Sequence, residues 1–287
     1  MKEFPLLRRS IVMHIVRCTL LALGVILLLA LGCAAPTQAR IISCRIEPEG
    51  FKSNAADIEA ICRSAAGALL RWFPGYEVPP FVVVRRHGGP VIGFHKNDQG
   101  EIVIYLDTEG TYWCQYSYQF AHEFCHLLCG YDDDFKGNMW FEETLAETAS
   151  IFALRAMART WKDNPPYPNW KEYRDALHDY ADDVVKSRSK ASEIRENGLN
   201  GFYLAHKTEL DKDPGNRELN GAMAVVFLHL FEEDPARWES VRWLNSSPSP
   251  EGETFTQYFR KWHDAVPDRH RELVEDIARL FGIDLAR

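Results

Sequence analysis

Two hydrophobic periods alternate along the first half of the chain. Between residues 54 and 73, apolar positions recur every three or four residues, which predicts an amphipathic helix. Runs rich in β-branched and aromatic residues then predict strands at 81–85, 91–95 and 101–106, the last two separated by turn residues at 97–100. This part of the chain is therefore expected to form a small, mostly antiparallel sheet.

The second half has a helical pattern throughout. Segments with glycine or proline separate helices that we predict at 112–129, 140–159, 169–188, 215–233 and 253–281. The expected fold class is α+β. Within a single domain at 41–287, a sheet-bearing half at 41–130 precedes an all-helical half at 131–287.

Residues 1–40 have the order of a secretory signal peptide. Basic residues between positions 8 and 17 precede an apolar run at 18–32, and small residues follow it. The apolar run is short for a membrane span, which needs about 20 residues. We expect the protein to be exported, either to a bacterial cell envelope or as a secreted protein.

The processing of this signal has three alternatives. Leu31-Gly32-Cys33 resembles the end of a bacterial lipobox, which would make the protein a lipoprotein attached to the membrane through a lipid on Cys33. Simple cleavage after Ala35 or Ala39 is the second alternative, and an uncleaved anchor is the third.

Charge narrows the choice of partners. The chain has 41 acidic and 33 basic residues, a net charge of −8, and no basic stripe follows the signal. Nucleic-acid binding needs clustered lysine and arginine to contact phosphates. We therefore expect no nucleic-acid partner.

Five of the seven cysteines follow the signal. An oxidising compartment favours disulfides, and Cys44 with Cys62 is one candidate pair. Cys125 and Cys129 lie one helical turn apart, which is an awkward geometry for a mutual disulfide. We expect this second pair to pack in the protein interior.

The candidate chemistry lies on the helix predicted at 112–129. His122 and His126 are four residues apart, so both imidazoles lie on one face and can reach one metal ion. Glu123 projects beside that ion and is placed to take a proton from a water molecule that the metal activates. The flanking residues are mainly apolar, so the helix is buried and its polar side chains need a partner. These features predict a Zn²⁺ site rather than two surface histidines.

A third protein ligand is expected from the start of the next helix. Glu143 and Glu147 lie one turn apart, so Glu143 is placed to ligate the metal and Glu147 to accept the second ring N–H of a ligand histidine. Glu142 is expected to be a solvated first-turn carboxylate that the helix dipole favours. An aspartate from 132–134 is the alternative third ligand.

The motifs HEFCH at 122–126 and WFEETLAE at 140–147 resemble those of the gluzincin clan of zinc metallopeptidases. In that clan the second motif reads approximately W-x-N-E-x-x-A-[ED]. Glu143 falls on the third ligand, Glu147 falls on the outer-shell acid, and Glu142 replaces the usual asparagine. The resemblance covers residues 118–148, and the gap between the motifs is a few residues shorter than usual.

The resemblance implies a zincin-like fold and further site residues. In zincins, a sheet strand beside the cleft pairs with extended substrate, and 101–106 is expected to be that strand. A donor for the oxyanion is expected from the helical half. Tyr203 and His206 are the candidates, with helix packing or a surface position as their ordinary roles.

These inferences favour an exported zinc metallopeptidase that hydrolyses peptides or proteins. Two alternatives stay open. The first is a non-catalytic binding protein with a zincin fold, although a purely structural zinc site would not need Glu123. The second is a zinc amidohydrolase that acts on cell-wall or other non-protein amides, for which the site chemistry would be nearly identical.

Overall fold

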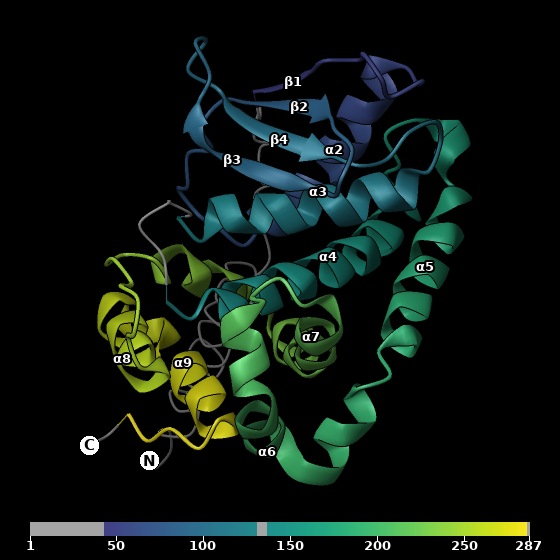
Figure 1. Ribbon diagram of the computed structural model, residues 1–287. Coiled ribbons are helices and arrows are strands. Elements are labelled where there is room, and N and C mark those ends of the chain that lie inside the picture. The colour runs from purple at the N-terminus through teal and green to yellow at the C-terminus, as the bar shows by residue number, and fades with distance from the viewer. Residues whose placement is uncertain (1–42, 131–136, 286–287) are drawn as a thin grey trace, which may run out of the picture. The chain divides into compact units, whose positions relative to one another are not determined.

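The computed structural model describes residues 43–130 and 137–285, in which a small sheet comes first and helices follow (Figure 1). The predicted export signal with Cys33 and the aspartates at 132–134 lie outside the described residues. Residues Ile41–Arg287 form a compact unit of their own. Within the described part, no helix is both long and apolar enough to cross a membrane.

The sheet has four strands in the order β1-β2-β4-β3. The strands are β1 (Cys44–Ile46), β2 (Phe81–Arg85), β3 (Val91–Lys96) and β4 (Ile102–Leu106). β1 pairs in parallel with β2, β2 pairs in parallel with β4, and only β3 and β4 are antiparallel. The expectation of a mostly antiparallel sheet is therefore wrong. Hydrophobic alternation predicts strands but not their order, and here β4 lies between β2 and β3.

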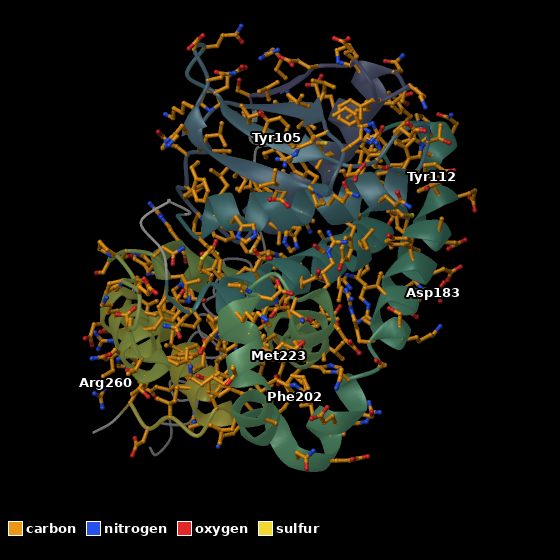
Figure 2. All side chains as sticks on the ribbon, in the orientation of Figure 1. Tyr105, Tyr112, Asp183, Phe202, Met223 and Arg260 are labelled. Atoms are coloured by element: carbon orange, nitrogen blue, oxygen red, sulfur yellow. The ribbon has the colours of Figure 1, made fainter. Side chains whose placement is uncertain are left out.

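Two helices contact the sheet and each other: α2 (Ala55–Leu70) contacts β1, and α3 (Trp113–Leu128) contacts β3 and β4 (Figure 1). The buried ring of Phe81 on β2 lies 5.7 Å from Phe120 and 5.9 Å from Phe124 of α3, measured between centroids. Alternate side chains point to the other face of a sheet, and Tyr105 on that face is only partly buried (Figure 2). α3 is thus held against the sheet by aromatic contacts on its buried side.

The C-terminal half is helical, as expected. Its helices are α4 (Met139–Trp161), α5 (Tyr173–Ser187), α6 (Ala191–Lys212), α7 (Arg217–Glu233), α8 (Phe255–Ala265) and α9 (Asp268–Leu280), with 3₁₀ segments η1 (Pro168–Trp170) and η2 (Pro235–Trp243). α4 is buried on nearly all sides and packs against α3, α5 and α7. Phe202 and Met223 belong to this core, whereas Asp183 and Arg260 are exposed (Figure 2).

Two details of the helical half differ from the prediction. The single helix expected at 253–281 is two helices, because Pro267 lacks an N–H and interrupts the hydrogen-bond ladder between α8 and α9. α6 was not predicted, since its sequence is largely polar and contains Gly198, whose φ of 72° interrupts the helical geometry. Packing against α7, α9 and α4 accounts for its stability.

All five described cysteines are buried free thiols. The candidate disulfide between Cys44 and Cys62 is therefore not formed. Cys125 and Cys129 lie in the hydrophobic core, as their helical spacing predicts.

Candidate metal centre

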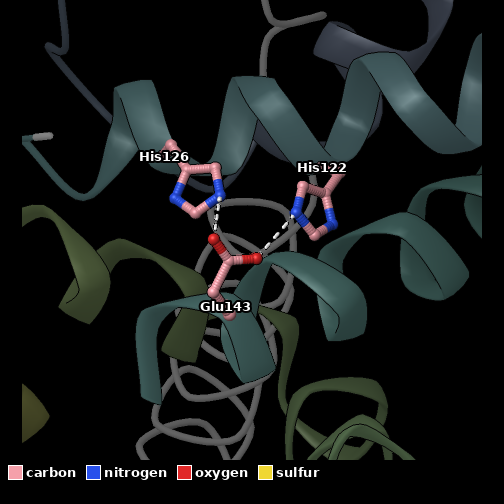
Figure 3. Close-up of side chains that lie close together, drawn as sticks. All are labelled: His122, His126 and Glu143. Carbon is pink, nitrogen blue, oxygen red and sulfur yellow. Dashed lines mark hydrogen bonds and ion pairs between the residues drawn. The ribbon is translucent and has the colours of Figure 1, made fainter. Parts of the chain in front are cut away.

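The candidate site lies where α3 crosses α4. His122 and His126 project from the side of α3 that faces α4, with ring centroids 5.1 Å apart (Figure 3). Gly130 ends the α3 segment with a φ of 74°, a conformation that glycine adopts without steric cost. After residues 131–136, α4 begins at Met139 and carries Glu143 beneath both imidazoles.

The carboxylate of Glu143 faces both histidines through their Nε2 atoms. One oxygen lies 3.2 Å from His122 Nε2, and the other lies 3.7 Å from His126 Nε2. One ligand atom from each residue lies within 4.8 Å of the other two. Tetrahedral zinc at about 2.0–2.1 Å from its ligands separates them by about 3.3 Å. This donor set fits three protein ligands of a zinc ion.

The electrostatics of these three residues favour added positive charge. Burial alone would lower the pKa of His126, but the carboxylates of Glu143 and Glu142 outweigh it and raise this pKa to about 10. The pKa of His122 is also raised, because Glu143 and Glu123 outweigh burial. Burial would raise the pKa of Glu143, but the two imidazoles and Arg217 lower it to about 2. A divalent cation supplies the same positive charge by displacing the imidazole protons.

Glu123 is positioned differently from Glu143. Its side chain is enclosed, with the residue 3% exposed, and lies against the edge strand β3. Burial raises the pKa of its carboxyl, while the two histidines and the backbone of Ile92 act in the opposite direction. A carboxylate with a raised pKa is suited to general base catalysis near neutral pH.

Glu142, expected to be solvated, is 6% exposed and bonded to the site. Its Oε1 lies 2.6 Å from His126 Nδ1, and its Oε2 accepts a hydrogen bond of 2.5 Å from Asn245. Asn245 in turn accepts a hydrogen bond from the Tyr258 hydroxyl. The expectation was wrong because the segment after η2 and helix α8 cover the first turn of α4. Nothing in the local sequence of α4 indicates that cover.

Glu147 does not have the predicted outer-shell contact, which Glu142 makes instead. It is 2% exposed and bonded to the Tyr118 hydroxyl and to Arg188, whose Nη2 lies 2.8 Å away. Arg188 also donates to the Tyr118 hydroxyl. A Cβ on Gly221 would lie 2.5 Å from Arg188 Nε, so a larger residue at this position would displace the guanidinium. Glu147 on α4 thus links Tyr118 on α3 to Arg188 at the end of α5, and Arg188 compensates its negative charge.

The two predicted oxyanion donors lie away from the site. Tyr203 is buried, with its ring centroid 5.1 Å from that of Trp140 and 5.2 Å from that of Phe255. His206 bonds Glu193 at 2.9 Å on the same helix, α6. Neither residue lines the cavity at Glu123, so both have the packing or surface roles that were their ordinary alternatives.

A cavity of about 210 Å³ adjoins the donor set. Helix α3 contributes His122, Glu123 and His126, and α4 contributes Glu143 and Glu147; the remaining lining residues are Pro90, Val91, Ile92, Gly215, Arg217 and Asn220. The strand beside this cavity is β3, not the predicted 101–106. Segment 101–106 forms β4, which is an interior strand between β2 and β3. Its hydrophobicity predicted a strand correctly but could not indicate its place in the sheet.

The start of α7 supplies cavity residues that the sequence did not reveal. Asn220 is buried, donates to Pro214 O at 2.6 Å and accepts from Thr144. Arg217 is exposed and reaches the same cavity. Neither belongs to a recognisable motif, and α7 meets α4 only through tertiary packing.

Comparison with known proteins identified no relative: no protein-family model, curated protein or solved structure matches the chain.

Proposed function

We propose that the protein is an exported zinc metallopeptidase. The observation that carries the proposal is the combination of a three-residue donor set with an adjoining cavity and a buried carboxylate at its wall. His122, His126 and Glu143 would hold the ion, and Glu123 would remain free for proton transfer. A structural zinc site is usually closed by four protein ligands, whereas a catalytic site has three and keeps a position open.

Zinc held by these three residues would supply Lewis acidity toward the scissile carbonyl and the attacking water. Glu123 takes a proton from the attacking water and delivers it to the leaving amine. Glu142 holds the ring of His126 by its Nδ1, which fixes the direction of Nε2.

The edge strand β3 supports a peptide as the substrate. In the described part of the chain it pairs with β4 on one side only, and Val91 and Ile92 line the cavity. An edge strand offers backbone donors and acceptors to an extended chain. An extended peptide beside β3 would bring a backbone carbonyl next to Glu123.

Metal content is the first test of this proposal. Zinc would be measured by mass spectrometry on the full chain, purified without chelators, for the wild type and for Glu143→Ala. We expect one zinc per wild-type chain and a reduced content in the variant. Wild-type protein that holds no zinc even after zinc is added would contradict the proposal and favour a binding protein.

Substrate class is tested on the zinc-loaded wild type. We expect cleavage of a mixed peptide library, and a chelator should abolish it. Cleavage of cell-wall fragments without cleavage of any peptide would contradict peptidase activity and identify the amidohydrolase alternative.

A further inference from the structure

A second cavity, here called the side chamber, adjoins the first beside His122. It measures about 250 Å³ and shares Pro90, His122, Glu147 and Arg217 with the first cavity. Its remaining lining residues are Gln115, Tyr118, Gln119 and Tyr180. A group bound in the side chamber would therefore lie directly beside the metal donors.

The acid in the side chamber wall is already compensated. Glu147 is bonded to Arg188 and to the Tyr118 hydroxyl. The side chamber therefore has little unpaired negative charge of its own.

Arg217 in the same wall is not compensated by an oppositely charged side chain in the described part of the chain. Arg217 is exposed, and its guanidinium forms no ion pair with any carboxylate in the part of the chain that the structure describes. Arg217 nevertheless reaches the site, because it lines both the side chamber and the cavity beside the donor set. One full positive charge is thus available to a ligand.

Neutral groups add hydrogen-bonding capacity. Gln115 accepts a hydrogen bond from Thr108 through its Oε1, which leaves its amide NH₂ as a donor. Tyr180 contributes a partly buried ring and a hydroxyl. The lining therefore suits a small anionic group better than an apolar side chain.

We propose that the side chamber binds a carboxylate of the substrate through Arg217, which makes the enzyme selective for peptides with a carboxylate next to the scissile bond. The inference rests on the proposed peptidase function. The planar guanidinium matches a carboxylate with two parallel hydrogen bonds. The carboxylate belongs either to the C-terminus of the peptide or to an Asp or Glu side chain.

Matched peptides test this selectivity on the zinc-loaded full chain. One pair differs only by a free or an amidated C-terminus, and a second, amidated pair differs only by Glu or Gln beside the cleaved bond. We expect kcat/KM for one carboxylate peptide to exceed that of its neutral partner by roughly tenfold to a hundredfold. The pair that responds identifies the source of the carboxylate.

Arg217→Gln should reduce this ratio to near one. Arg195→Gln is the matched control, since Arg195 is an exposed arginine on α6 that lines neither cavity. The control should retain the wild-type ratio. An equal loss on all four peptides in Arg217→Gln would overturn the proposal, because Arg217 would then act on a group common to every substrate. A wild type without preference would overturn it too.

Binding separates this inference from the proposed function. Fluorescence anisotropy of labelled carboxylate and neutral peptides would be measured on Glu123→Gln, with and without Arg217→Gln. A carboxylate preference that requires Arg217, without cleavage by the wild type, would support the side chamber and refute the peptidase. Cleavage by the wild type without a carboxylate preference would support the peptidase and refute carboxylate binding in the side chamber.

Discussion

Among the described residues, a histidine is buried against a glutamate in two places, which differ in what surrounds the pair. On α3 and α4, His126 bonds Glu142 at 2.6 Å. Between η2 and α9, His270 bonds Glu239 at 3.0 Å. Viewed as single contacts, the two pairs are alike.

The charge around each pair separates them. Glu239 also receives two hydrogen bonds of 2.9 Å from Arg269, so one carboxylate meets a guanidinium and an imidazole. At the candidate metal centre three carboxylates surround two imidazoles, and none of the three forms an ion pair with a lysine or arginine among the described residues. Only this cluster adjoins the 210 Å³ cavity. The two pairs therefore differ in surrounding charge and in adjoining space, and the metal site is proposed only where negative charge is in excess and space remains.

The largest effect is expected from the carboxylate at the cavity wall. Glu123→Gln should reduce kcat for peptide cleavage by about 10² to 10⁴, because it removes the general base. Zinc content should stay at the wild-type level. Glu239→Gln is the matched control and should cleave normally. Wild-type cleavage by Glu123→Gln would refute the mechanism.

Removing the histidine from each of the two His–Glu pairs tests whether only the pair at the candidate metal centre is needed for zinc binding. His126→Ala should lose stoichiometric zinc, because only two protein ligands remain, whereas His270→Ala should retain it. Zinc would be measured after dialysis against buffer of low zinc content. Equal zinc loss in both variants would mean that global folding, and not ligation, controls the metal.

An intermediate effect is expected from the partner of His126. Glu142→Ala should weaken zinc affinity by about tenfold to a hundredfold, since outer-shell acids orient and polarise their histidine. Competition with a zinc-sensitive dye measures the change. Glu253→Ala is a control, because the Glu253 carboxylate bonds Ser249 and not His126, and it should leave affinity unaltered. An unchanged affinity in Glu142→Ala would show that the Nδ1 contact is dispensable.

A substitution in the second cluster, formed by Glu239, Arg269 and His270, should change stability but not zinc binding. Glu239→Gln should reduce the free energy of unfolding by about 1–2 kcal/mol, a modest loss because Arg269 is largely exposed and can regain water. Urea denaturation of the zinc-loaded protein gives the value. A change in zinc stoichiometry would mean that the clusters are coupled.

The smallest effect is expected from a surface pair. Hydrogen bonds from Arg45 lower the pKa of Glu101 from 4.5 to about 2. A lowered pKa stabilises the fold above pH 4.5, and this contribution is lost as the pH falls toward 2. Urea denaturation of wild type and Arg45→Gln should therefore differ more at about pH 6 than at about pH 3. A difference that grows with acidity would contradict this assignment.

Elements with a local signal could be predicted from the amino-acid pattern. Helical spacing placed His122, Glu123 and His126 on one helix, and Glu143 at the start of the next. The apolar periods predicted α2, α3, α4 and the longer strands, because each repeats over several residues of one segment. The burial of Cys125 and Cys129 followed from the same spacing.

How these elements meet depends on packing between segments that are distant in the sequence. The order of the strands made β3 the edge beside the cavity, and the cover over α4 turned Glu142 into the partner of His126. Packing of α7 brought Arg217 to the cavity, while Tyr203 and His206 were directed elsewhere. Periodicity reports which face of an element is buried, but not which element covers it. Contacts between residues as far apart as Glu142 and Asn245 therefore depend on the fold as a whole.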